Sequence, residues 1–345
     1  MKLSMPLSYA GGFKESAAQA TELERAGLDT VWVAEAYGFD GVSLMGYIAA
    51  ITEHIEIGAA ILPIYTRTPT LLAMTAAGVD ALSDGRCLLG LGASGPQVIE
   101  GWHGVPYNQP VGRTREIVEI CRKVWSRERV THEGKAYTLP LPPEQGTGLG
   151  KPLKLITRPV RERIPIYVAS LGPRNVAMTA EVADGWLPIF YLPEKVAEVW
   201  GPDLAAGRAT RAADLGPLEV VAGGLVAVGD DAASLRDLAR PMIALYVGGM
   251  GARGRNFYND LARRFGFEAE AEEIQDLYLD GHKDEAAKAV PEGLLEAATI
   301  CGPEGYVRDR IAAYKASGVT MLNVTPIASD VPALVTRLKG WVTHA

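Results

Sequence analysis

The sequence predicts an α/β fold, a (β/α)8 TIM barrel with insertions after barrel strands, and three observations support this prediction. Apolar runs of strand length alternate with helical patterns along the chain, as expected where crossover helices join parallel strands. Several helical patterns end in a glycine that leads directly into the next apolar run. The length, 345 residues, is ordinary for one barrel with insertions. A doubly wound sheet is the alternative, because periodicity alone does not separate the two folds.

Eight strands are expected, over residues 3–8, 30–34, 55–62, 87–91, 166–169, 185–188, 218–228 and 319–324. Helices are expected between them, over residues 14–26, 42–52, 70–82, 113–126, 174–183, 232–246 and 303–317. Glycine supplies the left-handed C-cap that turns a helix toward the next strand, and Gly27, Gly85 and Gly318 follow three of these helices. Pro69 suits the first turn of the third helix.

Two stretches interrupt the alternation. Residues 131–160 are rich in proline and glycine and read as a hairpin followed by a long loop. Residues 248–300 read as mostly helical, with charged and apolar residues mixed. A barrel places such insertions on the loops after its strands, where they build the substrate pocket. No second domain separates cleanly, so residues 1–345 are expected to form a single domain.

The composition excludes several classes of protein. The formal net charge of -7, without a basic stripe, argues against a nucleic-acid partner. Three distant cysteines, Cys87, Cys121 and Cys301, form no C-x-x-C pair, so no disulfide framework or zinc cluster is expected and a reducing compartment fits. No apolar run approaches 18 residues, so no membrane span is expected. A cytoplasmic protein that acts on a small molecule is the prediction.

The segment GLGASG, residues 90–95, matches the G-x-G-x-x-G pattern of dinucleotide sites. Such a site requires the motif to open a helix in a βαβ unit. Here Pro96 follows at once, the next clear helix is expected only near Arg113, and the strand is the fourth of the chain. The favoured interpretation is therefore a strand end whose small residues let a planar ligand approach the mouth of the barrel.

Other strand ends carry candidate site residues. Glu35 ends the second strand, where a carboxylate is a candidate active-site group in a barrel; a glutamate on the loop surface is the alternative. The pair Ala59-Ala60 ends the third strand, and loop chemistry alone does not explain it. Further polar or aromatic residues on loops after strands are Asp40, Trp102, His103 and Tyr107.

The stretch YVASLGPRNVAMTAEVADGWLP, residues 167–188, passes from a strand to a helix through small residues, a proline and an arginine. A tight connection explains this pattern, and so does an anion held at the helix start. Asp184, in the turn before the sixth strand, resembles an αβ-loop acid with a structural role. A basic cluster before the fifth strand is either solvated or captures an anionic ligand tail, and it comprises Lys151, Lys154, Arg158, Arg161 and Arg163.

Together these stretches resemble the bacterial luciferase-like superfamily, and within it the coenzyme F420 (deazaflavin)-dependent oxidoreductases that include methylenetetrahydromethanopterin reductase. The resemblance covers residues 1–201 and resumes near residue 302. It rests on VWVAEAYGFD, IGAAILPIYTRTPTLLAMTAA, LSDGRCLLGLGASGPQVIEGWHGVPYNQP and VASLGPRNVAMTAEVADGWLP. These motifs are more specific for the superfamily than for F420 over FMN.

The resemblance implies a (β/α)8 barrel, usually a dimer, with the cofactor ring in its C-terminal mouth. It implies a cis peptide bond at Ala60–Ile61 behind the ring, and an acidic residue near the ring at Glu35. It also implies contacts to the cofactor from Ser94 and Gly95. The segment implied to hold the cofactor phosphate, by backbone N–H groups at a helix N-terminus, is Ser170, Leu171, Gly172, Pro173, Arg174 and Asn175.

The sequence departs from some relatives at two positions. A histidine that follows the acid of the second strand in those relatives is Ala36 here, and a glutamate after the glycine of the fourth strand is replaced by Pro96-Gln97. His103, Trp102 and Tyr37 are therefore candidates to replace these two residues. The catalytic candidates are Glu35, His103 and Tyr37, of which His103 has the most suitable intrinsic pKa for moving a proton near neutrality.

The resemblance implies an F420-dependent oxidoreductase that transfers a hydride between C5 of the deazaflavin and a small organic substrate. An FMN-dependent monooxygenase of the same fold is one alternative. A barrel relative that has lost catalysis is the other. No metal is expected, and a homodimer is.

Overall fold

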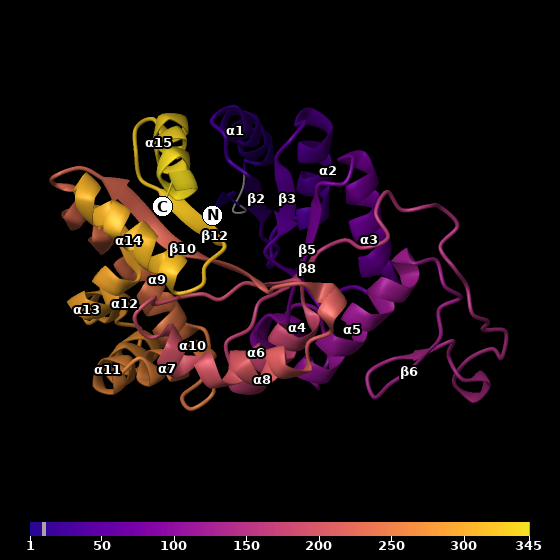
Figure 1. The fold of residues 1–345 in the computed structure, drawn as a ribbon. Helices are drawn as coiled ribbons and strands as arrows, with labels where there is room; N and C mark the ends of the chain where they lie inside the picture. The colour runs from indigo at the N-terminus through magenta and orange to yellow at the C-terminus, as the bar shows by residue number, and fades with distance from the viewer. Residues whose placement is uncertain (9–11, 345) are drawn as a thin grey trace.

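The computed structural model describes residues 1–8 and 12–344, and within them eight parallel strands close into a barrel (Figure 1). Strand β10 pairs with both β9 and β12, and β12 pairs with β1, which completes the ring. The predicted α/β barrel is thus confirmed. The barrel strands are β1 (Lys2–Pro6), β2 (Thr30–Val33), β3 (Glu56–Ala59), β5 (Cys87–Gly92), β8 (Ile166–Val168), β9 (Gly185–Trp186), β10 (Glu219–Val228) and β12 (Met321–Pro326).

The third predicted strand is interrupted. Strand β3 ends at Ala59, and after a cis peptide bond between Ala60 and Ile61 the chain forms the short strand β4 (Leu62–Pro63), which pairs with β5. The predicted cis peptide bond is confirmed. One strand was not predicted: β11 (Thr299–Gly302) pairs with the second half of β10, outside the ring of eight.

Helices surround the barrel (Figure 1). Those that follow its strands are α1 (Phe13–Arg25), α2 (Gly41–Ile51), α3 (Pro69–Leu82), α5 (Pro110–Trp125), α6 (Pro173–Val182), α8 (Gly201–Thr210), α14 (Glu304–Ala316) and α15 (Val331–His344). Capping residues fix two starts: Asp40 accepts from the backbone N–H of Ser43 before α2, and Thr68 caps α3 with Pro69 in its first turn. The predicted helices 70–82 and 303–317 match α3 and α14 closely.

Shorter elements fill the connections. They are the helices α4 (Pro96–Gly101), α7 (Val196–Val199), α9 (Arg240–Ala244), α10 (Phe257–Arg264), α11 (Glu268–Leu279), α12 (Lys283–Lys288) and α13 (Glu292–Ala297), the 3-10 turns η1 (Pro143–Gln145), η2 (Ala213–Leu215) and η3 (Ala232–Ala239), and the π-helical turn η4 (Leu245–Gly249). The single helix expected over 232–246 is therefore three successive elements. The helix start expected near Arg113 was wrong on two counts, because α4 follows Gly95 directly and α5 begins at Pro110.

The hairpin expected in 131–160 is present. Strands β6 (His132–Glu133) and β7 (Thr138–Leu139) pair antiparallel, and the segment that follows extends away from the barrel beyond α5 (Figure 1). Residues 257–297 hold the helices α10 to α13, as the mixed helical pattern indicates.

The core has two layers. Inside the barrel lie the side chains of Trp32, Leu88, Tyr167, Val221 and Met321, each at most 2% exposed. A second, larger apolar layer fills the space between the strands and the surrounding helices. Parallel strands covered by helices on the outside and packed inside require apolar residues on both faces, which explains the nearly continuous apolar runs of the sequence.

Ion pairs at the N-terminal ends of the strands account for part of the predicted basic cluster. Arg161 pairs with the buried carboxylate of Asp80, and Arg163 pairs with Asp184 and Asp214. Of the two alternatives for this cluster, capture of an anionic ligand does not hold for these two arginines, because both are paired with carboxylates of the protein. The structural role predicted for Asp184 is confirmed, since its Oδ2 also accepts from the backbone N–H of Ile166 at 2.9 Å.

Glu116 of α5 holds the hairpin against the barrel. Its carboxylate accepts from the backbone N–H groups of Lys135, Ala136 and Tyr137 and lies 3.2 Å from Nε2 of His132. Burial raises the pKa of Glu116, but hydrogen bonds from Ala136, Tyr137 and His132 lower it by more, so the net shift is downward. The folded pKa is therefore below the unfolded value, and the ionised carboxylate stabilises the fold above that unfolded value.

Substituting Glu116→Gln is expected to lower the free energy of unfolding at pH 7 by about 1–3 kcal/mol, because the hydrogen bonds to the partly buried N–H groups of Ala136 and Tyr137 lose their charge assistance. The stabilisation disappears as the pH falls through the folded pKa, so the difference between wild type and variant should shrink below about pH 4. Urea unfolding of both proteins from pH 3 to pH 8 measures this. A difference that stays constant over that range contradicts the assignment.

Candidate active site

A cavity of about 750 Å³ opens at the C-terminal ends of the barrel strands, within the usual size range of ligand pockets. Residues from several strand ends, from η4 and from the start of α10 line it. The lining residues are Pro6, Trp32, Ala60, Ile61, Gly92, Ala93, Ser94, Tyr107, Pro110, Val111, Ala169, Ser170, Leu171, Gly172, Pro173, Arg174, Asn175, Leu187, Pro188, Ile189, Val221, Tyr246, Phe257, Tyr258 and Asn323.

One wall is built from the ends of β3 and β5. Gly90 lies so close to the end of β3 that a Cβ atom there would be 1.7 Å from the carbonyl oxygen of Ala59. A Cβ atom on Gly92 would likewise be too close to its neighbour, at 2.8 Å from the Cγ1 atom of Ile61. Ser94 then adopts a left-handed conformation with φ of 57°, an arrangement that costs energy in a non-glycine residue and is common at functional sites. The small residues of GLGASG thus pack strand against strand at the cavity.

A second wall is the N-terminus of α6. Two indole N–H groups hold the preceding backbone: Trp186 donates to the carbonyl of Ser170 and Trp200 to that of Leu171, each at 2.9 Å. Gly172 is the N-cap residue of helix α6 and supplies no side-chain cap, and the N–H groups of Gly172 and Arg174 have no acceptor within the described residues. Unpaired N–H groups at a helix start favour an anion, aided by the partial positive charge of the helix.

The side chains of this segment are used unequally. The Ser170 hydroxyl is buried and shares a hydrogen bond of 2.9 Å with Thr179. This hydroxyl is therefore already paired within the protein. Arg174 is exposed and forms no ion pair within the described residues. The Asn175 side-chain oxygen is buried with no partner in the described part of the chain. A bound ligand that donates to Asn175 and accepts from the α6 amides would satisfy these groups.

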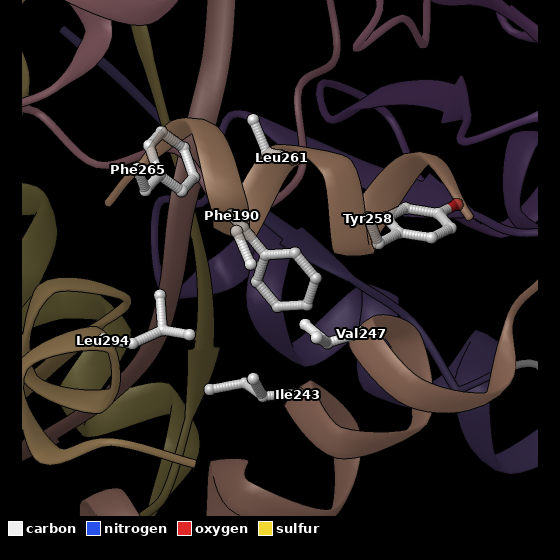
Figure 2. A pocket seen from close by; sticks show the side chains of 8 residues that line it. Phe190, Ile243, Val247, Tyr258, Leu261, Phe265 and Leu294 are labelled. Atoms are coloured by element: carbon white, nitrogen blue, oxygen red, sulfur yellow. The ribbon is translucent and has the colours of Figure 1, made fainter. Parts of the chain in front are cut away.

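A third wall comes from the helical segment after β10. Tyr246 of η4 and Phe257 and Tyr258 of α10 line the cavity. Behind them lies a small apolar cavity of about 10 Å³, and Figure 2 shows Phe190, Val247 and Leu261 around it with the Tyr258 ring at its edge. This packing holds α10 against the barrel. No residue of 131–160 lines the main cavity, so the expectation that this insertion forms the pocket wall was wrong.

The interior of the barrel contributes polar atoms to the same cavity. The Trp32 indole N–H is buried and has no acceptor among the described residues. Asn323 from β12 accepts a hydrogen bond from the Ser4 hydroxyl at 3.1 Å, which fixes its side chain. A buried donor without an acceptor is uncommon in proteins and marks a place where a ligand oxygen can bind.

Four of the predicted residues lie outside the cavity lining. Glu35 forms a bidentate ion pair with Arg67, at 2.6 and 2.8 Å, and its Oε2 accepts from the backbone N–H of Gly41. Tyr37 and His103 are exposed, Tyr37 packing near the Trp102 ring, and Gly95 precedes α4. The predicted residues that do line the cavity are Ala60, Ile61, Ser94, Ser170, Leu171, Gly172, Pro173, Arg174 and Asn175.

Sequence reasoning missed five residues of the lining that carry polar atoms or rings, namely Trp32, Tyr246, Phe257, Tyr258 and Asn323. Trp32 reads as core in an apolar strand. The others lie in segments that match no motif, although Asn323, a polar residue near the end of an apolar strand, was a usable signal.

The described residues contain no group of three or more His, Cys, Asp and Glu side chains arranged to hold a metal ion. Nor does any described helix have the length and apolar character needed to cross a membrane. The polar atoms of the cavity lining belong to hydroxyl, amide, indole and guanidinium groups.

The closed barrel and the cavity at the C-terminal ends of its strands are typical of (β/α)8-barrel enzymes, which bind their ligands at that end. The chain belongs to the luciferase-like monooxygenase family, whose model matches residues 2–321.

Two relatives and one solved structure extend this result. A Mycobacterium tuberculosis protein provisionally named as a coenzyme F420-dependent oxidoreductase is 43% identical, over 94% of this chain and 95% of its own length. The 5,10-methylenetetrahydromethanopterin reductase of Archaeoglobus fulgidus is 28% identical, over 89% and 88% of the two chains. The coenzyme F420-dependent tetrahydromethanopterin reductase of Methanopyrus kandleri has the same fold, with a TM-score of 0.82, 22% identity, and coverage of 99% and 98%.

Proposed function

We propose that this chain is a coenzyme F420-dependent oxidoreductase that transfers a hydride between the deazaflavin and a small organic substrate. The observation that carries the proposal is the uncapped N-terminus of α6, whose free N–H groups face a cavity large enough for a cofactor and a substrate. The Mycobacterium tuberculosis and Archaeoglobus fulgidus relatives support the same cofactor, since the first is named for coenzyme F420 and the second for methylenetetrahydromethanopterin reduction, and the structure of the same fold is named as an F420-dependent tetrahydromethanopterin reductase.

The residues present fit this cofactor. Its phosphate needs N–H donors and a cation, which Gly172 and Arg174 supply; its polyol chain carries hydroxyl donors, for which the orphaned oxygen of Asn175 is a partner. The flat wall of Ala60, Ile61 and Gly92 leaves room for a planar ring because glycine and alanine project little into the cavity.

When bound, a deazaflavin supplies hydride chemistry at C5 and reacts poorly with oxygen. The protein's own part is to bind, orient and exclude water. The α6 amides and Arg174 hold the anionic end, and the wall between β3 and β5 fixes the plane in which a ring can lie. The apolar lining from Val111, Leu187 and Ile189 reduces the water that surrounds the reacting groups.

Titrating the protein with F420 and, separately, with FMN tests the proposal by quenching of cofactor fluorescence. F420 is expected to bind at least about 100-fold more tightly than FMN, a difference of roughly 2.7 kcal/mol. Tight binding of FMN alone would instead support the monooxygenase alternative. Binding of neither cofactor would support a barrel that has lost catalysis.

Substituting Arg174→Ala is expected to weaken F420 binding by about tenfold, because a charge-assisted hydrogen bond to a phosphate is lost. Arg25→Ala removes the same charge from an exposed position at the end of α1 and serves as the control. If Arg174→Ala binds F420 like wild type, backbone amides alone hold the phosphate. Gly172→Asp then decides the site, because an aspartate at the N-cap would occupy those N–H groups itself and repel the anion.

We also propose a homodimer in a reducing compartment. Large apolar side chains of α2 and α3 are exposed on the outside of the barrel, namely Ile51, Leu71, Met74 and Leu82. The three cysteines are buried and free, as reducing conditions permit. A dimer and a cytoplasmic location remain predictions.

A further inference from the structure

The substrate side of the cavity has a distinctive chemistry. Of the lining residues in the described chain, Arg174 is the one with a charge, and the proposed function assigns it to the cofactor phosphate. The remaining polar atoms come from phenols, amides, hydroxyls and the indole N–H of Trp32. A charged substrate would therefore lose its hydration without gaining a partner of opposite sign, which is costly.

Three tyrosines, Tyr107, Tyr246 and Tyr258, are the remaining titratable residues of this lining. The predicted proton donor, His103, is exposed and does not line the cavity. Tyr107 already donates to the carbonyl of Ser94 at 3.4 Å. The Tyr258 hydroxyl, by contrast, has no hydrogen-bond partner among the described residues, and Figure 2 shows it pointing away from Phe190 and the apolar cavity.

The Tyr258 ring is held firmly. It packs edge-on against the rings of Tyr246, at 4.8 Å between centroids, and of Phe190, at 6.5 Å. Val247 and Leu261 line the small apolar cavity together with this ring (Figure 2). Edge-to-face packing of this kind stabilises one orientation of each ring.

Buried asparagine side chains fix the backbone on which the tyrosines stand. Asn256, 1% exposed, donates to the carbonyls of Tyr246 and Val247, both at 3.0 Å, and accepts from the N–H of Tyr258 at 2.9 Å. Asn259 adds a bond to Val247 at 3.1 Å. These bonds join α10 to the π-helical turn η4, and single π-helical turns are frequent at functional sites.

Tyr258 is thus a positioned phenol without a hydrogen-bond partner among the described residues, and it lines a cavity in which Arg174 is the charged side chain. Burial raises the pKa of the Tyr258 hydroxyl, and the neighbouring phenols Tyr246 and Tyr107 raise it further. The hydroxyl therefore stays protonated and can donate a hydrogen bond at neutral pH.

We propose that the substrate is an uncharged, largely apolar carbonyl compound and that Tyr258 is the catalytic residue that hydrogen-bonds its oxygen. This proposal rests on the proposed function. In the reductive direction, reduced deazaflavin is the hydride source, and the hydride forms a C–H bond at the carbonyl carbon. The C–O π bond breaks, its electron pair takes the phenolic proton of Tyr258, and the resulting phenolate regains a proton from water. The substrate gains two electrons and becomes an alcohol.

Three ligands of nearly equal size test the proposal by isothermal titration calorimetry, with the protein saturated with oxidised F420 and with the unloaded protein. They are 2-acetylnaphthalene, which is neutral with an acceptor oxygen, 2-ethylnaphthalene, which has no acceptor, and 2-naphthoate, which is an anion. The ketone is expected to bind at least about tenfold more tightly than the anion, because the cavity offers the carboxylate no partner of opposite charge.

Tyr258→Phe keeps the ring and its packing and removes only the hydroxyl. It is expected to weaken ketone binding by about 3- to 10-fold, the value of one hydrogen bond, and to leave 2-ethylnaphthalene unchanged. It is also expected to slow ketone reduction by about 100-fold or more through loss of the proton donor. Tyr47→Phe, which removes an exposed hydroxyl of α2, is the matched control and should change none of these values.

Equal binding of ketone and naphthoate would overturn the assignment of a neutral substrate. Equal loss of ketone and ethylnaphthalene binding in Tyr258→Phe would reduce Tyr258 to a packing role, and no loss would remove it from the site. If F420 itself fails to bind, the proposed function falls. The binding half of this proposal is then still decided on the unloaded protein by comparing the ketone with ethylnaphthalene in wild type and Tyr258→Phe, because neither of these ligands carries a charge that Arg174 could pair with.

Discussion

Substituting Gly90→Ala is expected to destabilise the protein by about 3 kcal/mol or more, and to abolish F420 binding in the fraction that still folds. The added methyl group would lie 1.7 Å from the carbonyl oxygen of Ala59, which is backbone and cannot rotate away. The ends of β3 and β5 must then separate. Ala60 and Ile61 line the cavity directly after that carbonyl, so their positions change with it.

Gly78→Ala is the matched control. Gly78 lies within α3 with no atom near the place where its Cβ would stand, so alanine should stabilise the helix by about 0.5–1 kcal/mol. The same chemical change is thus expected to have opposite effects at the two glycines. Thermal unfolding together with F420 titration measures both. A Gly90→Ala protein with wild-type stability and affinity would show that the close approach of the strands is not required.

The close approach at Gly90 also shows how far sequence reasoning reaches. The pattern of small residues in GLGASG indicated a strand end at the barrel mouth, and the strand and cavity are found there. What the pattern could not show is which backbone atom Gly90 meets. Ala59 is 31 positions away in the chain, and its carbonyl is brought to Gly90 only by the pairing of β3 with β5.

The sequence predicted residue roles correctly where the role is to start or fix a nearby helix or strand. Pro69 starts α3 and Asp184 fixes the start of β8, as expected from their places in the sequence. The same signal was overlooked at Pro96, which opens α4 as a proline in the first turn of a helix commonly does. That error followed from giving the glycine motif more weight than the proline.

Residues that act through distant partners were beyond such reasoning. Arg161 looked like a free cation, but Asp80 neutralises it from the end of α3, 81 positions away. Tyr258 carried no signal, because its segment is helical with mixed residues and its role depends on Asn256 and η4. A residue whose role depends on tertiary contacts can be identified only once the fold is known.

Glu35, predicted to lie near the cofactor ring, forms a buried ion pair with Arg67, and Glu35→Ala is expected to lower the free energy of unfolding by about 3–5 kcal/mol. The side chains of Glu35 and Arg67 are 8% and 15% exposed, so removing the carboxylate leaves a guanidinium without a partner. Its hydrogen bond with Glu35 raises the pKa of Arg67 despite burial, so the guanidinium keeps its charge. Chemical denaturation of the variant measures the loss.

A charge-free double variant separates this structural role from the ring contact that the family resemblance implies. Glu35→Gln with Arg67→Met removes both charges together, and because a buried pair costs much of its own desolvation energy, the double variant should be more stable than Glu35→Gln alone. If Glu35 serves only to pair with Arg67 and to hold the N–H of Gly41, F420 should bind the double variant nearly as it binds wild type. If the carboxylate moves to the ring when the cofactor binds, affinity falls in the double variant although stability recovers. If Glu35 is only structural, stability and F420 affinity recover together in the double variant. If Glu35 contacts the ring, stability recovers and affinity does not. Measuring both quantities for wild type, the two single variants and the double variant distinguishes these interpretations.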